Sequence, residues 1–156
     1  MGYITAVGEE MTGLVAGPLD VGAAIASVSE AAAGGVAVFL GTTRAEAHPD
    51  GRLLVALDYE AYPEMAGAQL RDLAERARAR WPVLRLAVLH RTGRVAVGEP
   101  SVLIAVATPH RGEAFEACRW LIDTLKAEAA IWKQEVWSDG HTSWVTGNRL
   151  PSPGTP

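Results

Sequence analysis

Only two of the fourteen basic side chains in this sequence are lysines, and the two lie close together, at Lys126 and Lys133. The other twelve are arginines. Lysine carries a compact charge whose pKa falls readily on burial, whereas arginine stays protonated. If the protein needs an amine that can release a proton, we therefore expect it at these two positions. A GC-rich coding bias also produces an arginine-rich composition, so composition alone leaves both interpretations open.

Two more basic residues, His110 and Arg111, stand where a helix is expected to begin. A cation there opposes the helix dipole, so a purely structural role is unfavourable. Together with free backbone N–H groups, these side chains could hold a phosphate or a carboxylate. Arg44 follows a predicted buried strand, where loops often present side chains to a site, although a solvated loop arginine is the simpler interpretation. If the five basic residues converge, they form a pocket for a multiply charged anion.

Other kinds of site are not indicated. The four histidines lack the spacing of metal ligands, so no metal site is expected. The single cysteine, Cys118, falls on the apolar face of a predicted helix, which favours packing over nucleophilic chemistry. Dinucleotide-binding, phosphate-loop and serine-hydrolase motifs are absent, and no bound cofactor is expected. Asp58 and Glu60 share a strand face, but exposed carboxylates usually form solvated ion pairs.

Charge and hydropathy indicate a cytoplasmic globular protein. The net charge of −4 argues against a general nucleic-acid binder. No apolar run approaches the roughly 18 residues of a membrane span. The N-terminus, with Glu9 and Glu10, does not resemble a secretory signal. A single cysteine allows no internal disulfide, which fits a reducing compartment.

Two long helices are predicted to support the basic residues. After Pro63, apolar residues recur at three-to-four spacing as far as about Arg80. A second helix is expected with Thr108-Pro109 as N-cap and first turn, so that Lys126 lies near its end. Its predicted core face consists of Phe115, Cys118, Ile122, Leu125 and Ala129. A shorter helix is expected after the N-cap residue Asp20.

Apolar segments bounded by turn residues predict strands at 36–40, 53–62, 84–90 and 101–107. A final hairpin is expected around Asp139-Gly140. The predicted fold is α+β or mixed α/β, with two main helices packed on a mixed, mostly antiparallel strand layer.

The chain is interpreted as one domain with two flanking segments. Residues 1–18 form an N-terminal extension with one short strand at 3–7. Residues 19–150 form the domain, since 156 residues suffice for a single core. Residues 151–156, which begin and end with proline, are expected to be a disordered tail.

Several blocks of the sequence resemble the family of the large, catalytic subunit of molybdopterin synthase. The blocks are VAVFLGTTR (36–44), VALDYEAYPEMA (55–66) and the stretch from RWPVLRL to IWKQE (80–135). The resemblance runs over about 19–144, in the family's order. Its most specific elements are YEAYPEMA, the PHR and EAFEA block, and two lysines with six residues between them. It implies an α/β-hammerhead fold and a homodimer in which each subunit binds one small ubiquitin-like subunit.

The resemblance also implies a reaction. The small subunit's C-terminal Gly-Gly carries a thiocarboxylate that enters a pocket of the large subunit. Two sulfur transfers convert cyclic pyranopterin monophosphate into the dithiolene of molybdopterin and open the cyclic phosphate. By position, Lys126 and Lys133 match the catalytic lysines. The residues that match substrate-binding positions are Arg44, His110, Arg111 and, for the neighbouring subunit's pocket, Arg149.

Two other functions fit the same residues. A non-catalytic dimeric scaffold would bind a ubiquitin-like partner or an anionic ligand without turnover, although the presence of both lysines favours an enzyme. A different phosphate-ester enzyme would use the same basic cluster, but no evident general base or metal site supports it. Binding that requires the partner's free Gly-Gly tail would favour the synthase or the scaffold over the phosphate-ester enzyme. Turnover with the sulfurated partner would then favour the synthase over the scaffold.

Overall fold

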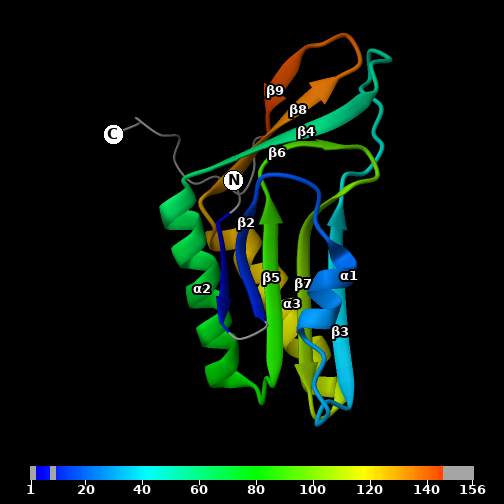
Figure 1. Ribbon diagram of the computed structural model, residues 1–156. Helices are drawn as coiled ribbons and strands as arrows, with labels where there is room; N and C mark the ends of the chain where they lie inside the picture. Colours follow the sequence, from blue (N-terminus) through cyan, green and yellow to red (C-terminus); the bar gives the residue numbers. More distant parts are fainter. Residues whose placement is uncertain (1–2, 8–9, 146–156) are drawn as a thin grey trace.

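The structure is a computed structural model that describes residues 3–7 and 10–145 (Figure 1). Its helices are α1 (Val21–Ser27), α2 (Pro63–Arg80) and α3 (Arg111–Glu128). Its strands, in chain order, are β1 (Tyr3–Val7), β2 (Glu10–Val15), β3 (Gly35–Thr42), β4 (Leu54–Ala61), β5 (Arg85–Arg91), β6 (Gly93–Ala96), β7 (Pro100–Thr108), β8 (Ile131–Trp137) and β9 (Thr142–Trp144). In the described part of the chain, no helix is long and apolar enough to cross a membrane.

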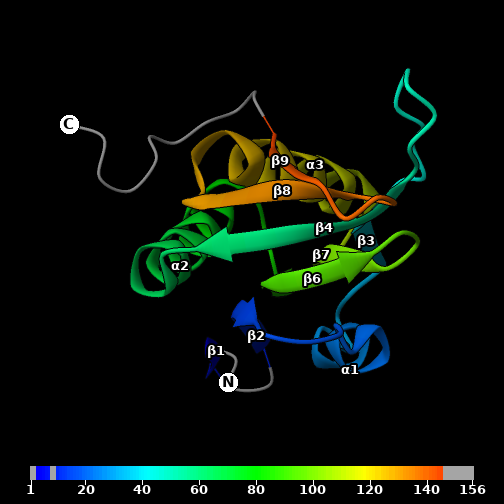
Figure 2. The ribbon, with the colours of Figure 1, turned by 90° about the horizontal axis from the view of Figure 1, so that it is seen from above.

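The larger sheet has five strands in the order β1-β2-β5-β7-β3. Its pairs are antiparallel except for the parallel pair of β2 and β5. Successive residues of β5 point to opposite faces, so Leu86 and Val88 pack with α2 and α3, while Ala87 and Leu89 pack with α1. Figure 2 shows α3 and α1 on opposite sides of this sheet. Both faces of the central strands are therefore buried, which explains their continuous apolar sequences.

The smaller sheet has four antiparallel strands in the order β6-β4-β8-β9. It crosses one end of the larger sheet (Figure 1). Leu54, Leu57 and Trp137 form a small apolar cluster of their own there. Two mostly antiparallel sheets with separate helices confirm the prediction of an α+β fold.

Local sequence signals predicted the helices well. Helix α2 begins at Pro63 and ends at Arg80, as the proline and the apolar spacing indicate. Before α1, the carboxylate of Asp20 accepts a hydrogen bond from the backbone N–H of Ala23 at 2.9 Å, which is the predicted N-cap.

The start of α3 differs from the prediction. Thr108 is not the N-cap but the last residue of β7, fully buried, and its hydroxyl donates a hydrogen bond to the carbonyl of His110. His110 is the N-cap residue, and the helix begins at Arg111. Phe115 was also assigned wrongly to the core, since its exposed fraction is 66%. The core face instead follows Ala114, and Phe115 is one residue, or about 100°, away from it around the helix.

The strands also contain features that periodicity did not reveal. The short strand expected at 3–7 is present as β1, but β2 follows it and pairs with β5 inside the larger sheet. Strand β6 was not predicted, and it joins β4 in the other sheet. The alternation predicted for 53–62 fails at its start, because a register shift between Leu54 and Ala56 leaves Val55 exposed. The predicted tail, 151–156, lies outside the described residues.

Candidate functional site

A pocket of about 330 Å³ lies where the two sheets meet the end of α3. Both sheets contribute strands to it, β4 and β8 from the smaller one and β5 and β7 from the larger one. Its polar lining residues are Tyr59, His90, Ser101, Lys126, Trp132 and Lys133. The remaining lining residues are apolar, which limits water around a bound ligand and strengthens charge interactions.

Both lysines of the sequence line this pocket. Lys126 lies in the last turn of α3, and Lys133 is the third residue of β8. Burial lowers the pKa of Lys133, and the charge of Lys126 lowers it further, while Glu135 and Glu46 oppose the shift. The Lys133 ammonium also lies 5.9 Å from the centre of the Tyr59 ring. The structure therefore pairs one exposed cation with a half-buried amine that releases its proton more easily.

The short turn between α3 and β8 sets the spacing of the two lysines, and Gln69 of α2 holds that turn. Its side-chain amide N–H donates to the carbonyl of Glu128 at 3.0 Å, and its amide oxygen accepts from the backbone N–H of Ala130 at 2.6 Å. Arg76 adds an ion pair to the Glu128 carboxylate at 2.7 Å. The bond from Gln69 to Glu128 satisfies one of the carbonyls that the end of a helix leaves without partners.

His90 forms part of the pocket wall, at the end of β5. Its exposed fraction is 5%, and its ring meets the edge of the Tyr59 ring with 4.9 Å between centroids. The imidazole Nδ1 lies 2.8 Å from the carbonyl oxygen of Arg91. The pKa of His90 is lowered to about 4, mainly by burial. The hydrogen bond to Arg91 acts in the opposite direction, while the charges of Lys126 and Lys133 lower the pKa further. His90 is therefore neutral at physiological pH.

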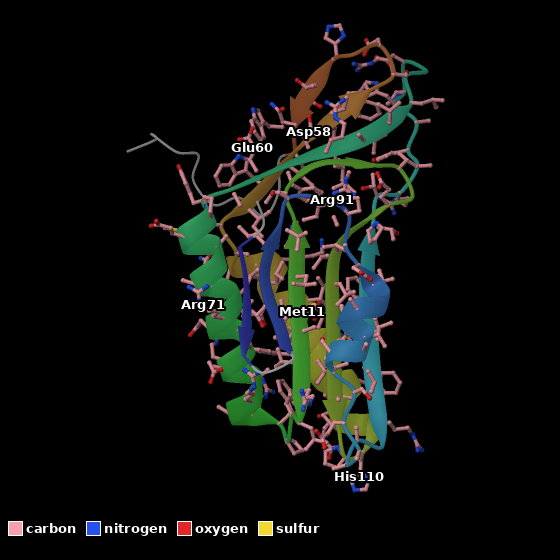
Figure 3. All side chains as sticks on the ribbon, in the orientation of Figure 1. Met11, Asp58, Glu60, Arg71, Arg91 and His110 are labelled. Carbon is pink, nitrogen blue, oxygen red and sulfur yellow. The ribbon has the colours of Figure 1, made fainter. Side chains whose placement is uncertain are left out.

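His110 and Arg111 line a second, shallower site at the other end of α3. Both side chains are exposed, and Gly34 approaches the backbone of Pro109 so closely that only glycine fits there. About 22 Å of helix separates Arg111 from Lys126, at 1.5 Å per residue. Figure 3 shows His110 at the opposite end of the molecule from Asp58 and Glu60 of β4. The two sites share no lining residue.

The five predicted basic residues thus do not converge within one subunit. Arg44 is exposed in the loop after β3, and it has no hydrogen bond or ion pair with any residue that the structure describes. It follows the end of β3, whereas Gly35 at the start of β3 lies against Arg111. Only the two lysines share a pocket. Arg149 lies outside the described residues.

Three polar residues that line the lysine pocket were not predicted from the sequence. Tyr59, Ser101 and His90 lie in strands that were predicted only as core elements. A histidine at the end of an otherwise apolar strand was the one available signal for His90. Asp58, whose side chain is 28% exposed, forms an ion pair with Arg94 at 2.9 Å, as the ion-pair interpretation expected.

Among residues 11–145, no group of three or more histidine, cysteine or acidic side chains could hold a metal ion. Cys118 is buried, and desolvation raises the pKa of its thiol to about 11, so it is not poised as a nucleophile.

The sequence model of one family, described as MoaE protein, matches residues 14–128. The chain belongs to the MoaE family. A molybdopterin synthase catalytic subunit from Nostoc sp. is 42% identical over 139 residues, which are 88% of this chain and 83% of that protein. One from Pyrococcus abyssi is 39% identical over 92% of this chain and 96% of its own length. These findings confirm the family that the sequence blocks predicted.

A solved structure supports the same family assignment. The crystal structure of molybdopterin synthase from Staphylococcus aureus superimposes with a TM-score of 0.81 and 29% sequence identity. The match covers 87% of this chain and 97% of that one. The MoaE-family fold of the present chain therefore includes both sheets and all three described helices.

Proposed function

We propose that this MoaE-family chain is the catalytic subunit of a molybdopterin synthase and acts as a sulfurtransferase in the cytoplasm. In this reaction a small ubiquitin-like subunit delivers sulfur as a thiocarboxylate on its C-terminal Gly-Gly. The acceptor is cyclic pyranopterin monophosphate, which becomes the dithiolene of molybdopterin after two transfers. The observation that carries the proposal is the pocket in which Lys126 and Lys133 meet.

The pocket suits a reaction between two anions. The thiocarboxylate and the phosphate-bearing substrate repel each other in water, and cations fixed in advance reduce that repulsion. Lys126 supplies a charge at the pocket opening, where the partner's tail would enter. Lys133, with its lowered pKa, is suited to exchange a proton as the substrate ring opens. Apolar residues such as Leu125 and Val102 keep water from competing with the sulfur.

The separation of the two basic sites indicates how the remaining residues contribute. In one subunit, His110 and Arg111 lie too far along α3 to line the lysine pocket. We propose that they serve the pocket of the second subunit in a homodimer, together with that subunit's Arg44.

Strand β3 provides a surface for such a dimer. It is an edge strand of the larger sheet, and its outward residues Val36, Val38 and Leu40 have exposed fractions of 45%, 40% and 38%. An uncovered apolar edge strand favours pairing with another chain. A two-fold axis between antiparallel β3 strands would place the start of one strand beside the end of the other. Arg111, which packs at the start, would then approach the partner's Arg44, which follows the end.

A direct assay tests the proposal. The purified chain is mixed with thiocarboxylated small subunit and cyclic pyranopterin monophosphate, and dithiolene formation is followed. We expect product in the complete mixture and none when this chain is omitted. Binding of the small subunit without product, beside an active control enzyme, would instead support the non-catalytic scaffold. Binding that requires the free Gly-Gly tail would favour the synthase or the scaffold over a different phosphate-ester enzyme.

A further inference from the structure

His90 combines deep burial with one ring nitrogen that has no partner. Its Nδ1 lies 2.8 Å from the carbonyl oxygen of Arg91. A carbonyl oxygen only accepts hydrogen bonds, so Nδ1 carries the proton. In a neutral imidazole the lone pair then belongs to Nε2. Nε2 has no hydrogen-bond partner among the described residues, although the side chain is only 5% exposed and lines the lysine pocket.

The surroundings of the ring keep it neutral and fixed. Tyr59 from β4 packs against one side, and the charges of Lys126 from α3 and Lys133 from β8 act on it from the pocket. Burial and these two cations lower the pKa of His90 to about 4. His90 is thus a fixed, uncharged hydrogen-bond acceptor beside two amines. It cannot hold an anion, and a bound N–H or O–H donor would satisfy it.

A ligand that fits this arrangement has an anionic group for the lysines and a donor close to that group. The C-terminal glycine of a protein tail has both, because its amide N–H and its carboxylate or thiocarboxylate are attached to the same Cα. We propose that His90 is a further binding residue of the pocket, whose Nε2 accepts a hydrogen bond from the amide N–H of the terminal glycine of the small subunit's tail. This inference rests on the proposed function, which brings that tail into the pocket.

The sharpest test changes the ligand and leaves the protein intact. Two short fluorescent peptides are compared, one ending in Gly-Gly with a free carboxylate and one in which the terminal glycine nitrogen is methylated. Methylation removes the N–H donor and keeps the charge. We expect it to weaken binding to the wild-type protein roughly tenfold, the effect of leaving a buried acceptor without its partner.

Variants of His90 then show whether that donor meets this residue. His90→Asn keeps a donor near the Nδ1 position but lacks an acceptor at Nε2, so both peptides should bind it with the same weakened affinity. The side chain of Gln reaches the Nε2 position, so His90→Gln should retain part of the preference for the unmethylated peptide. Thermal unfolding of each variant checks that it is folded. Since the acceptor is neutral, the preference in the wild type should stay constant between about pH 5.5 and 7.

The outcomes separate this inference from the proposed function. If the Gly-Gly peptide binds, and binds less well to Lys126→Ala, but methylation has no effect, His90 does not contact the tail and only the inference fails. If methylation still weakens binding to folded His90→Asn, the acceptor is another residue, and again only the inference fails. Peptide affinity unchanged in His90 variants that have lost turnover would assign His90 to the pterin substrate. If neither peptide binds the wild type, the proposed tail pocket is wrong and the inference fails with it.

Discussion

Mixed dimers provide a direct test of how the two basic sites combine. One protein carries Lys126→Ala, and the other carries His110→Ala with Arg111→Ala. Each homodimer alone should be inactive, because every pocket in it lacks either the lysine or the anion-binding pair. After subunit exchange, a mixed dimer has one pocket with both defects and one pocket with neither, if the two groups of residues come from different subunits.

The expected activity follows from counting these pockets. Random exchange of equal amounts makes about half of the dimers mixed, and each mixed dimer restores one pocket of two, so activity should reach about a quarter of the wild-type value. If each pocket used residues of one subunit only, both pockets of the mixed dimer would be defective and no activity would return. A pocket shared between subunits therefore predicts recovered activity, whereas a pocket within one subunit predicts none.

The assay is dithiolene formation before and after exchange, with exchange monitored by differently tagged subunits. A mixture of wild type with Lys126→Ala serves as the control, because it shows that exchange itself does not inactivate the pockets. The exposed Arg119 offers a matched variant, Arg119→Ala, which removes a surface cation of the same helix and should leave activity unchanged. Complete exchange without recovered activity would refute the shared pocket.

Three further predictions concern single residues. Lys133→Arg keeps the charge but replaces the amine whose pKa burial lowers, so activity should collapse while binding of the small subunit, measured by calorimetry, largely survives. Full activity would show that charge alone suffices at this position. Gln69→Leu leaves the buried backbone N–H of Ala130 without its acceptor. The free energy of unfolding, measured in urea, should therefore fall by about 1–3 kcal/mol. Gln69→Glu retains an acceptor oxygen, so its free energy of unfolding should fall by less. Equal losses for the two variants would contradict this role of Gln69. Because the pKa of His90 falls from 6.5 to about 4 on folding, the unfolded state binds more protons between these values, and stability should decline as pH falls from 6.5 to 4. The decline should be smaller in His90→Gln by up to about 3 kcal/mol, and identical pH profiles would show that the buried ring is not responsible.

Much of the local structure could be predicted from the sequence, because the signals involved act over a few residues. Apolar spacing and Pro63 predicted α2 from Pro63 to about Arg80, and Asp20 predicted the start of α1. The scarcity of lysine drew attention to Lys126 and Lys133, which do share a pocket. The sequence blocks at 36–44, 55–66 and 80–135 predicted the family, and the comparisons confirmed it.

Other features depend on contacts between distant segments, for which a single sequence has no periodic signal. The pairing of β2 with β5 and the placement of β6 in the second sheet arise from strand partners far apart in the chain. The length of α3 separates His110 and Arg111 from the lysines. In the sequence, all four residues were candidates for one anion-binding pocket. His90 stays neutral because burial, and to a smaller extent the charges of Lys126 and Lys133, lower its pKa, and Tyr59 of another strand packs against its ring. The sequence alone determined which residues could do the chemistry, and tertiary packing determined which of them meet, since distances and burial depend on the whole fold.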